Sequence, residues 1–330
     1  MAFYSYIFTA NYKRFFTKLK AVAQQEHRSF LGLVLDTGWC VFRHGLALSD
    51  YLNYKIYRRS PAQRRQYVGV RAQNRFYEQV SPSAYKQRYT VKPIFLQEFA
   101  AYTKRDFVVP NGENYHEFLD YLHSHSVFMA KPYDGLGGKG VEKVYTKDIA
   151  DPKAYFDLCS ENRIFLEDLV IQHEEMNRLC PASVNTMRIM TFHDHGSSRI
   201  LWVGLRVGNG VNAVDNFHAN GMVCRVDMET GRLTGNAIDK DNNEFSHHPI
   251  TGLTFDGFQI PCFREARELV LQAALESDKI LVVGWDVAIS DKGPVIIEGN
   301  RRPGFDIVQV LDDRGRKDIV DSVLSSLFKA

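Results

Sequence analysis

The segment VGWDVAISDKGPVIIEGN at residues 283–300 constrains the fold more than any other stretch of this chain. Two apolar runs are joined by the tripeptide Asp-Lys-Gly, and this pattern predicts a β-hairpin with a three-residue loop. With the loop glycine in the left-handed conformation, Ser290 faces Pro294, and counting back pairs Asp286 with Glu298. The segment therefore predicts an antiparallel sheet in which two carboxylates stand opposite each other.

This pair of carboxylates predicts a metal site. Directly opposed side chains lie roughly 5 Å apart, so two like charges are unfavourable there unless a cation lies between them. Asn300 shares the face of Glu298, because side chains alternate along a strand. Two carboxylates and an amide oxygen are hard donors that suit Mg²⁺, which also takes oxygens from nucleotide phosphates. The predicted ligands are Asp286, Glu298 and Asn300.

A glycine-rich loop follows a second apolar strand, in the segment VFMAKPYDGLGGKGV at residues 127–141. Its glycines are Gly135, Gly137, Gly138 and Gly140. Backbone N–H groups of such a loop can approach phosphates closely, although the spacing fits neither a dinucleotide-binding fingerprint nor a P-loop. Lys131 on the preceding strand can reach a phosphate as a point charge. Together with the acidic cluster, the loop predicts a nucleoside triphosphate with magnesium.

The pattern of hydrophobic residues changes along the sequence. Its length of 330 residues suggests about two domains. Residues 1–90 have mainly helical periodicity, with breaks near Pro61 and Pro82. From about residue 105, short β-rich runs alternate with Gly, Asp and Asn, and helices are predicted at about 264–278 and 315–328. Hairpins mixed with helices predict an α+β fold rather than a parallel doubly wound sheet.

Charge is distributed unevenly. Residues 1–92 hold 16 Lys and Arg against 4 Asp and Glu, which leaves 25 basic and 35 acidic residues in the remainder, so a net +12 is followed by −10. A basic surface attracts nucleic acid, anionic lipid or an acidic substrate, and a solvated helical face is the alternative. No RNA- or DNA-binding pattern accompanies it, so nucleic acid is the weakest of these partners. Peripheral contact with a membrane stays open.

Several classes of protein are disfavoured by the sequence. The five cysteines are scattered without CxxC spacing, which argues against a disulfide framework or a structural zinc site and indicates reduced, mostly buried thiols. No run approaches the length of a transmembrane span, and the first residues lack a signal-peptide pattern, so a cytoplasmic protein is expected. Trp39, Trp202 and Trp285 are expected to pack in the interior.

The motifs resemble those of the ATP-grasp superfamily over about residues 90–310. The KPxxGxGGKGV loop, the FLEDLVIQH strand and the Asp286…Glu298-Gly-Asn300 pattern occur in the superfamily's order. Longer segments, including QHEEMNRLCPASVNTMRIMTF and HHPITGLTFDGFQIP, resemble the sugar-transfer-associated group related to TupA-like enzymes and α-L-glutamate ligases. The resemblance implies two α+β lobes around ATP, at residues 91–170 and 171–330, after a basic helical region at 1–90.

The resemblance also implies roles for individual residues. It assigns nucleotide contacts to Lys92 and Lys131, to the flap residues Gly135, Gly137, Gly138, Lys139 and Gly140, and to the hinge residues Glu167, Asp168, Leu169 and Val170. Gln172 or His173 is expected near the ribose or the substrate. The resemblance assigns the binding of magnesium to Asp286, Glu298 and Asn300. These assignments predict one site that binds ATP and Mg²⁺.

The chain departs from the family pattern in two places. Many ATP-grasp ligases carry an arginine two residues before the first metal carboxylate, where this chain has Gly284. The stabilising cation is then expected from Arg188, Arg206, Arg301 or Arg302, of which Arg188, Arg206 and Arg302 are the catalytic candidates. In the loop at 216–222, the family's Gly-Gly is replaced by Asn-Gly, so the substrate contacts expected from Asn216, His218 and Arg301 rest on a loop of altered shape.

The predicted activity is that of an ATP-dependent carboxylate–amine ligase. In such a reaction ATP phosphorylates a carboxylate, an amine attacks the acyl phosphate, and ADP and phosphate leave. By resemblance the substrate is an acidic sugar or an amino acid in glycan or secondary-metabolite biosynthesis, and an anionic glycan would suit the basic first third. A small-molecule kinase of the same fold and a non-catalytic nucleotide- or glycan-binding scaffold are the alternatives.

Overall fold

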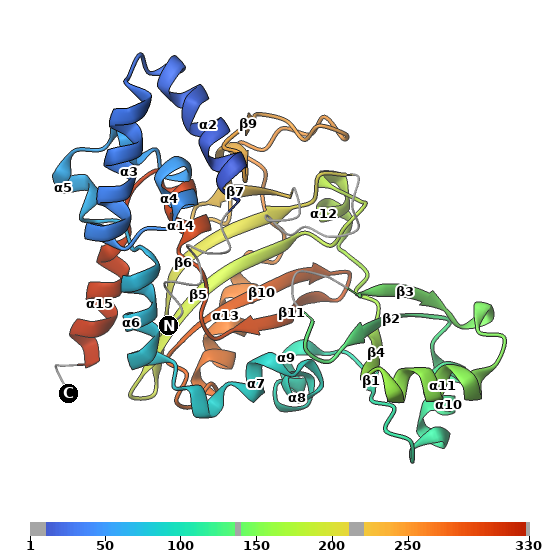
Figure 1. Ribbon diagram of the computed structural model, residues 1–330. Helices are drawn as coiled ribbons and strands as arrows, with labels where there is room; N and C mark the ends of the chain where they lie inside the picture. The colour runs from blue at the N-terminus through green and yellow to red at the C-terminus, as the bar shows by residue number, and fades with distance from the viewer. Residues whose placement is uncertain (1–10, 136–139, 211–220, 328–330) are drawn as a thin grey trace. The chain divides into compact units, whose positions relative to one another are not determined.

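The structure is a computed structural model, and it describes residues 11–135, 140–210 and 221–327 (Figure 1). The chain folds into two compact units. The first unit contains residues 1–82, 240–243 and 303–330, and the second contains 83–239 and 244–302. The first unit is helical where it is described, as the periodicity of residues 1–90 predicts, and the second contains both β-sheets.

The helical unit combines the beginning and the end of the chain. Its helices are α2 (Tyr12–Gln25), α3 (Phe30–His44), α4 (Leu48–Asn53), η1 (Ile56–Arg58), α5 (Pro61–Arg64), α6 (Val70–Val80), α14 (Asp306–Leu311) and α15 (Lys317–Leu327). α3 begins where the Ser29 hydroxyl accepts a hydrogen bond from the Gly32 amide, and it ends at Gly45, whose φ of 66° favours glycine. The buried Gln309 side chain binds both backbone groups of Val68, and this contact joins the two ends of the chain.

One carboxyl group is buried inside this unit. Asp50 is 9% exposed, and its Oδ2 accepts a hydrogen bond from the Ala47 amide at 2.8 Å. Burial, which outweighs that hydrogen bond, raises the pKa of Asp50 to about 7. The native state therefore holds a proton that the unfolded chain releases from a pKa of about 4 upward. The free energy of unfolding should fall as the pH rises through this window.

Asp50→Asn tests this linkage. The amide keeps an oxygen acceptor for Ala47 but does not titrate, so the variant should lose most of the destabilisation, roughly 3 kcal/mol, that the wild-type protein suffers between pH 4 and pH 8. Chemical denaturation followed by circular dichroism across this pH range provides the measurement. The exposed Glu78, changed to Gln, is the control. An unchanged slope in Asp50→Asn would show that other groups cause the pH dependence.

The smaller sheet of the second unit is antiparallel throughout. Its strands are β1 (Phe107–Val108), β4 (Ile164–Asp168), β2 (Val127–Pro132) and β3 (Glu142–Tyr145), in that spatial order. The helices α10 (Tyr115–Ser124) and α11 (Pro152–Glu161) bury Phe118 and Phe156 against it, in one cluster with Phe128 of β2. A short η3 (Thr146–Asp148) precedes α11.

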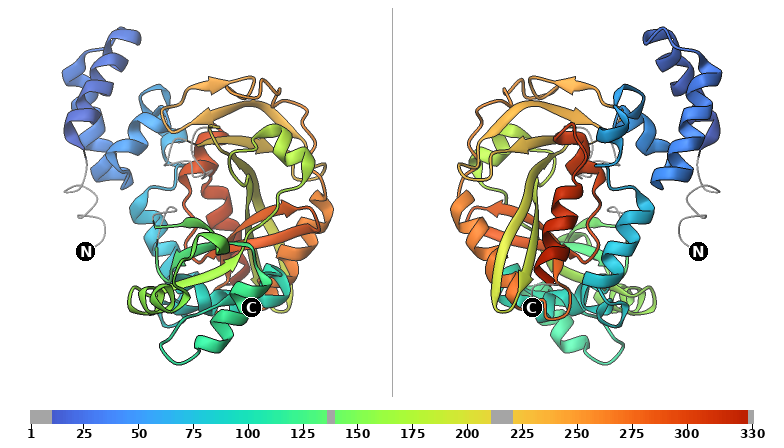
Figure 2. Two further views of the ribbon diagram at one scale, coloured as in Figure 1. Left: turned by 90° about the vertical axis from the view of Figure 1, so that its right-hand side faces the viewer. Right: turned by 90° about the vertical axis from the view of Figure 1, so that its left-hand side faces the viewer.

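The larger sheet has seven antiparallel strands in the order β11-β10-β5-β6-β7-β8-β9 (Figure 1). Figure 2 shows its yellow and orange strands from two further sides. They are β5 (Thr186–Asp194), β6 (Ser197–Val207), β7 (Met222–Val226), β8 (Leu233–Asp239), β9 (Glu244–Phe245), β10 (Val282–Ser290) and β11 (Gly293–Asn300). The helix α13 (Phe263–Leu275) packs on β5, β6, β10 and β11. Shorter helices complete the unit: η2 (Ser83–Tyr85), α7 (Gln87–Thr90), α8 (Lys92–Glu98), α9 (Ala100–Thr103) and α12 (Glu174–Leu179). The α+β arrangement is confirmed.

The β10–β11 hairpin reaches the predicted pairing by a different route. Ser290 pairs with Gly293, so the loop has two residues instead of the predicted three. The register then skips Ile297, and this bulge shifts the strands by one position, so that Asp286 faces Glu298. The pairing of the carboxylates is confirmed, while the predicted loop is wrong because the sequence pattern did not reveal the bulge.

Burial corrects one further expectation. All five cysteines are free, and four are buried, as predicted. Trp202 and Trp285 are 3% and 0% exposed, but Trp39 is 57% exposed, so its predicted place in the interior is wrong. Within the described parts of the chain, no helix combines the length and the hydropathy that crossing a membrane requires.

Candidate active site

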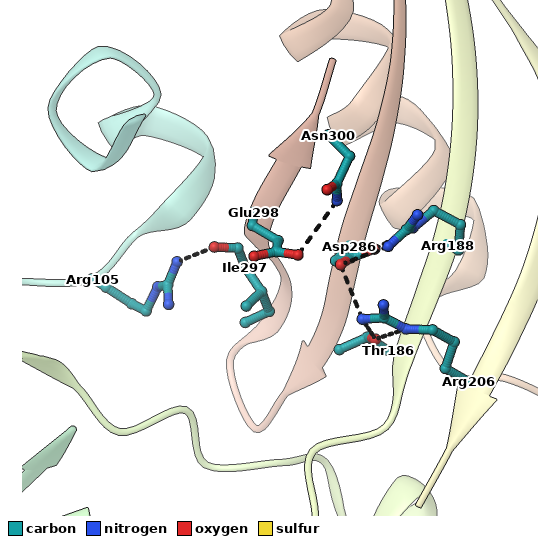
Figure 3. Close-up of polar contacts among 8 residues, drawn as sticks. All are labelled: Arg105, Thr186, Arg188, Arg206, Asp286, Ile297, Glu298 and Asn300. Carbon is teal, nitrogen blue, oxygen red and sulfur yellow. Dashed lines mark hydrogen bonds and ion pairs between the residues drawn. The ribbon is translucent and has the colours of Figure 1, made fainter. Parts of the chain in front are cut away.

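Two arginines hold the carboxylate of Asp286 on the larger sheet. Arg188 lies directly across from it on β5, and it contacts both carboxylate oxygens, Nη2 to Oδ2 at 3.1 Å (Figure 3). Arg206, one strand further, donates from Nη2 to the same Oδ2 at 2.9 Å. Its guanidinium is oriented by Thr186, whose hydroxyl accepts hydrogen bonds at 3.0 and 2.7 Å. Two of the four arginines expected to supply a cation are therefore at the carboxylate.

Glu298 lies on the other side of Asp286, so that Arg188, Asp286 and Glu298 form a row across three adjacent strands. Asn300 Nδ2 donates to Glu298 Oε1 at 3.4 Å, so both side chains share one face of β11 (Figure 3). Burial opposes the ionisation of Asp286, but Arg188 and Arg206 outweigh it and lower its pKa. Burial and the neighbouring Asp286 raise the pKa of Glu298. Two carboxylates in register thus have opposite pKa shifts.

The donor set at this row fits a divalent cation. Glu298 is partly buried beside a second carboxylate, and like charges at this separation favour a cation between them. The oxygens of Asp286, Glu298 and Asn300 are the hard donors that Mg²⁺ prefers. These three residues are therefore the ones that would hold the ion.

A second charged cluster centres on Glu167 at the end of β4. Its side chain is 3% exposed, and it contacts Lys131 on β2 and Arg105 Nη1, the latter at 3.0 Å. Burial opposes the ionisation of Glu167, yet Arg105 and Lys131 lower its pKa. Glu167 and Lys131, which sequence analysis assigned to the nucleotide, are therefore brought together as an ion pair.

Arg105 connects the two clusters. Besides Glu167, its Nη2 donates to the backbone carbonyls of Ile296 at 3.1 Å and Ile297 at 2.9 Å (Figure 3). These carbonyls lie on β11 immediately before Glu298, so one guanidinium spans from the smaller sheet to the strand that carries the predicted metal ligands. The two clusters therefore form one site within the second unit.

Lys92 also belongs to this site. It is the first residue of α8, its amide donates to Tyr133 O at 2.8 Å, and its Nζ contacts the carbonyl of Gly135. Burial lowers the pKa of the Lys92 ammonium. The charge of Lys131 lowers it further, and the charge of Glu298 acts in the opposite direction. Both predicted lysines therefore lie close to the glycine-rich loop.

The predicted hinge residues lie at the end of β4 and directly after it. The neighbouring Gln172 and His173 make hydrogen bonds within the segment around α12. Leu169 and Val170 are half-buried, and Asp168 accepts a hydrogen bond from the Asp106 amide at 3.0 Å. The buried Gln172 uses its amide group on Asn185 and on three other groups of the α12 loop. His173 Nδ1 caps α12 by accepting from the Glu175 amide at 3.1 Å. Gln172 therefore holds the loop around α12 together, and the expected contact of Gln172 or His173 with ribose or substrate stays a prediction.

Other predicted residues are placed less centrally or lie outside the described residues. Arg301 is half-buried and Arg302 is exposed, both in the loop after β11. The structure gives Arg302 no contact with Asp286 among the described residues. Gly140 is described, with a φ of 71° that favours glycine. The remaining predictions, Gly137, Gly138, Lys139, Asn216 and His218, lie outside the described residues.

Sequence reasoning missed Arg105 and Thr186. Arg105 lies in a short polar segment before β1 with no motif around it, so nothing in the sequence pointed to its partners. Thr186 did carry a signal, because it precedes Arg188 by two residues on the same strand face and faces Arg206 on β6. Strand alternation applied to β5 would have found Thr186.

Comparisons with known proteins identify the family of this chain. A family model described as sugar-transfer associated ATP-grasp matches residues 86–324. No curated protein matches the chain. The family match confirms the predicted ATP-grasp fold.

Solved structures similar to the chain include three enzymes of low sequence identity. The ATP-grasp ligase PsnB, complexed with minimal precursor, Mg and ADP, is 13% identical, with a TM-score of 0.41 over 75% of this chain and 61% of its own. D-cycloserine synthetase DcsG is 14% identical, with a TM-score of 0.40 over 74% and 73%. D-alanyl-alanine synthetase A from Vibrio cholerae is 10% identical, with a TM-score of 0.42 over 72% and 66%. This chain therefore spans less than two thirds of PsnB.

Proposed function

Because the chain belongs to the sugar-transfer-associated ATP-grasp family, we propose that it is an ATP-dependent carboxylate–amine ligase that releases ADP. One observation carries the proposal. Glu298, Asp286 and Arg188 are in register on three adjacent strands, with Arg206 bonded to the same carboxylate. Such a row places metal ligands beside fixed cations, which is what transfer of a phosphoryl group to a carboxylate requires.

The residues of the site have different proposed roles, which follow from their positions. Lys92 and Lys131 lie beside the glycine-rich loop and would bind phosphates as point charges. Arg188 and Arg206 would neutralise charge that develops on the carboxylate substrate during transfer. Asp286, Glu298 and Asn300 would hold magnesium, which would add charge neutralisation at the phosphates when bound.

The substrate class follows from charge and from the family. We propose an acidic sugar or an amino acid as the carboxylate, joined to an amine in polysaccharide or secondary-metabolite assembly in the cytoplasm. The basic surplus of residues 1–92 supports an anionic glycan as the acceptor, because it would raise the local concentration of anions. The proposed reaction requires an amine as the second substrate and says nothing more about its identity.

The decisive experiment is nucleotide turnover with product identification. The protein is incubated with Mg·ATP and pools of uronic acids, amino acids and amino sugars, and ADP and new masses are measured. ADP with an amide product, lost in Asp286→Asn, is the expected result. ADP with a phosphorylated product would replace the ligase by a kinase. Absence of Mg·ATP binding would overturn the enzyme and support a scaffold.

A further inference from the structure

The outward side of α3 is apolar although it faces solvent. Its exposed set is Leu31 (65%), Leu35 (67%), Trp39 (57%) and Phe42 (73%), which we call the outer face of α3. Their spacing places them on one side of the helix, opposite the buried Leu33, Thr37 and Cys40. Single exposed apolar residues are common, but a contiguous group of this size marks an interaction surface.

A second exposed apolar contact joins α2 and α3. α2 and α3 pack side by side in the helical unit (Figure 1). The ring of Phe16 on α2 lies edge-on to that of Phe30 at the start of α3, with centroids 6.4 Å apart, and both rings are 41% exposed. This exposed aromatic pair lies where α2 packs against α3, in the same helical unit as the outer face of α3.

Basic side chains accompany this surface, and the acidic ones nearby are already bound. Lys13 and Lys20 are exposed and lie three residues before and four residues after Phe16, on the same side of α2. Arg43 is exposed in the last turn of α3. Among residues 11–82 there are four acidic side chains, and three are engaged inside the unit: Glu26 with Arg58, Asp36 with Arg64, and Asp50 with the Ala47 amide.

We propose that the outer face of α3 inserts into the interfacial layer of a membrane that contains anionic lipid. Leucine and aromatic side chains flanked by lysine and arginine are the composition of a helix that lies in the membrane plane. Tryptophan favours the depth of the lipid headgroups. α3 has 15 residues and is too short to span a bilayer. The positive surplus matches the negative surface of such a membrane better than an uncharged protein partner.

This inference stands apart from the proposed ligase activity, because every residue that carries it lies in the helical unit. A second copy of the chain is the competing occupant, and the experiment separates the two.

Trp39 is a built-in probe for the test. Trp202 and Trp285 are buried, so a lipid-dependent change in tryptophan emission reports Trp39. The full-length protein is mixed with vesicles of phosphatidylglycerol and phosphatidylcholine in equal amounts, or of phosphatidylcholine alone. With the anionic vesicles the emission should move to shorter wavelength and be quenched by bromine on the acyl chains. Binding should weaken as salt is added. Trp39→Phe should remove the signal while co-sedimentation persists.

Matched variants test the surface itself. Leu35→Ser with Phe42→Ser should lower the vesicle partition coefficient by about a hundredfold, because two large apolar side chains no longer enter the lipid. Lys13→Glu with Lys20→Glu should lower it by about tenfold or more on anionic vesicles only. Leu158→Ser, which changes a leucine of the other unit that is 50% exposed, should have no effect. Circular dichroism checks that each variant is folded.

Three results would overturn the proposal. One is the absence of binding to anionic vesicles at low salt. Another is binding without a change in Trp39 emission. The third is a concentration-dependent dimer in light scattering that Leu35→Ser with Phe42→Ser abolishes, which would make a second copy of the chain the occupant.

Discussion

Glu298→Gln is expected to lower ATP-dependent turnover by about a thousandfold or more without weakening the fold. The amide keeps the size of the side chain and its contact with Asn300, but it removes one negative charge from the predicted magnesium ligands. In the protein without ligands, the same change removes a partly buried like charge from beside Asp286. The free energy of unfolding should therefore stay constant or rise by about 1 kcal/mol.

The contrast between activity and stability is what makes this variant informative. Turnover is measured as ADP release at saturating Mg·ATP, and stability by urea denaturation without nucleotide. Asp291→Asn is the matched control, since it changes an exposed carboxylate in the turn of the same hairpin. Loss of activity together with a large loss of stability would mean that Glu298 supports the sheet, and full activity in Glu298→Gln would remove it from the metal site.

The second large effect is expected from Arg105→Met. Arg105 and Glu167 are 4% and 3% exposed at their side chains, and their ion pair is 3.0 Å long. Removing the guanidinium leaves Glu167 buried with Lys131 as its remaining cation, and it also frees two backbone carbonyls of β11. Breaking a buried pair in this way typically costs about 3 to 5 kcal/mol.

Tryptophan fluorescence can follow this loss of stability in the second unit, which contains Arg105. In a Trp39→Phe background, Trp202 and Trp285 remain, and both lie in the second unit, so urea denaturation reports that unit. Adding Glu167→Gln to Arg105→Met should recover part of the lost stability, because the stranded charge is gone. Arg264→Met, at a pair with an 88% exposed arginine, should change stability by less than about 1 kcal/mol. Equal effects at both arginines would contradict the argument.

Much of the fold could be predicted from local patterns. Strand alternation and turn residues placed β2, β4, β10 and β11, and helical spacing placed α13 and α15 within a few residues. The pairing of Asp286 with Glu298 followed from counting along the hairpin, although a two-residue turn and a bulge replaced the expected three-residue loop. Local sequence predicts such elements because backbone conformation and side-chain alternation are short-range properties.

The site was predictable only where its residues share a hairpin or a motif. Asp286, Glu298 and Asn300 lie within 15 residues of one another, so their common face follows from strand geometry. Gln172 shows the limit, since its residue type suits a ligand contact, yet its amide is used by the loop around α12. Which groups are left for a substrate depends on every other partner in the fold.

The chain by itself thus determined the α+β class, the hairpin that pairs two carboxylates, and the basic character of its first third. Only the tertiary structure decided that Arg188 and Arg206 reach Asp286, that Arg105 joins the two charged clusters, and that Trp39 faces solvent. These contacts join residues that are roughly 60 to 190 positions apart, and Trp39 is exposed because α3 buries its opposite side. Periodicity marks an apolar face, but packing of the whole chain determines which face is covered.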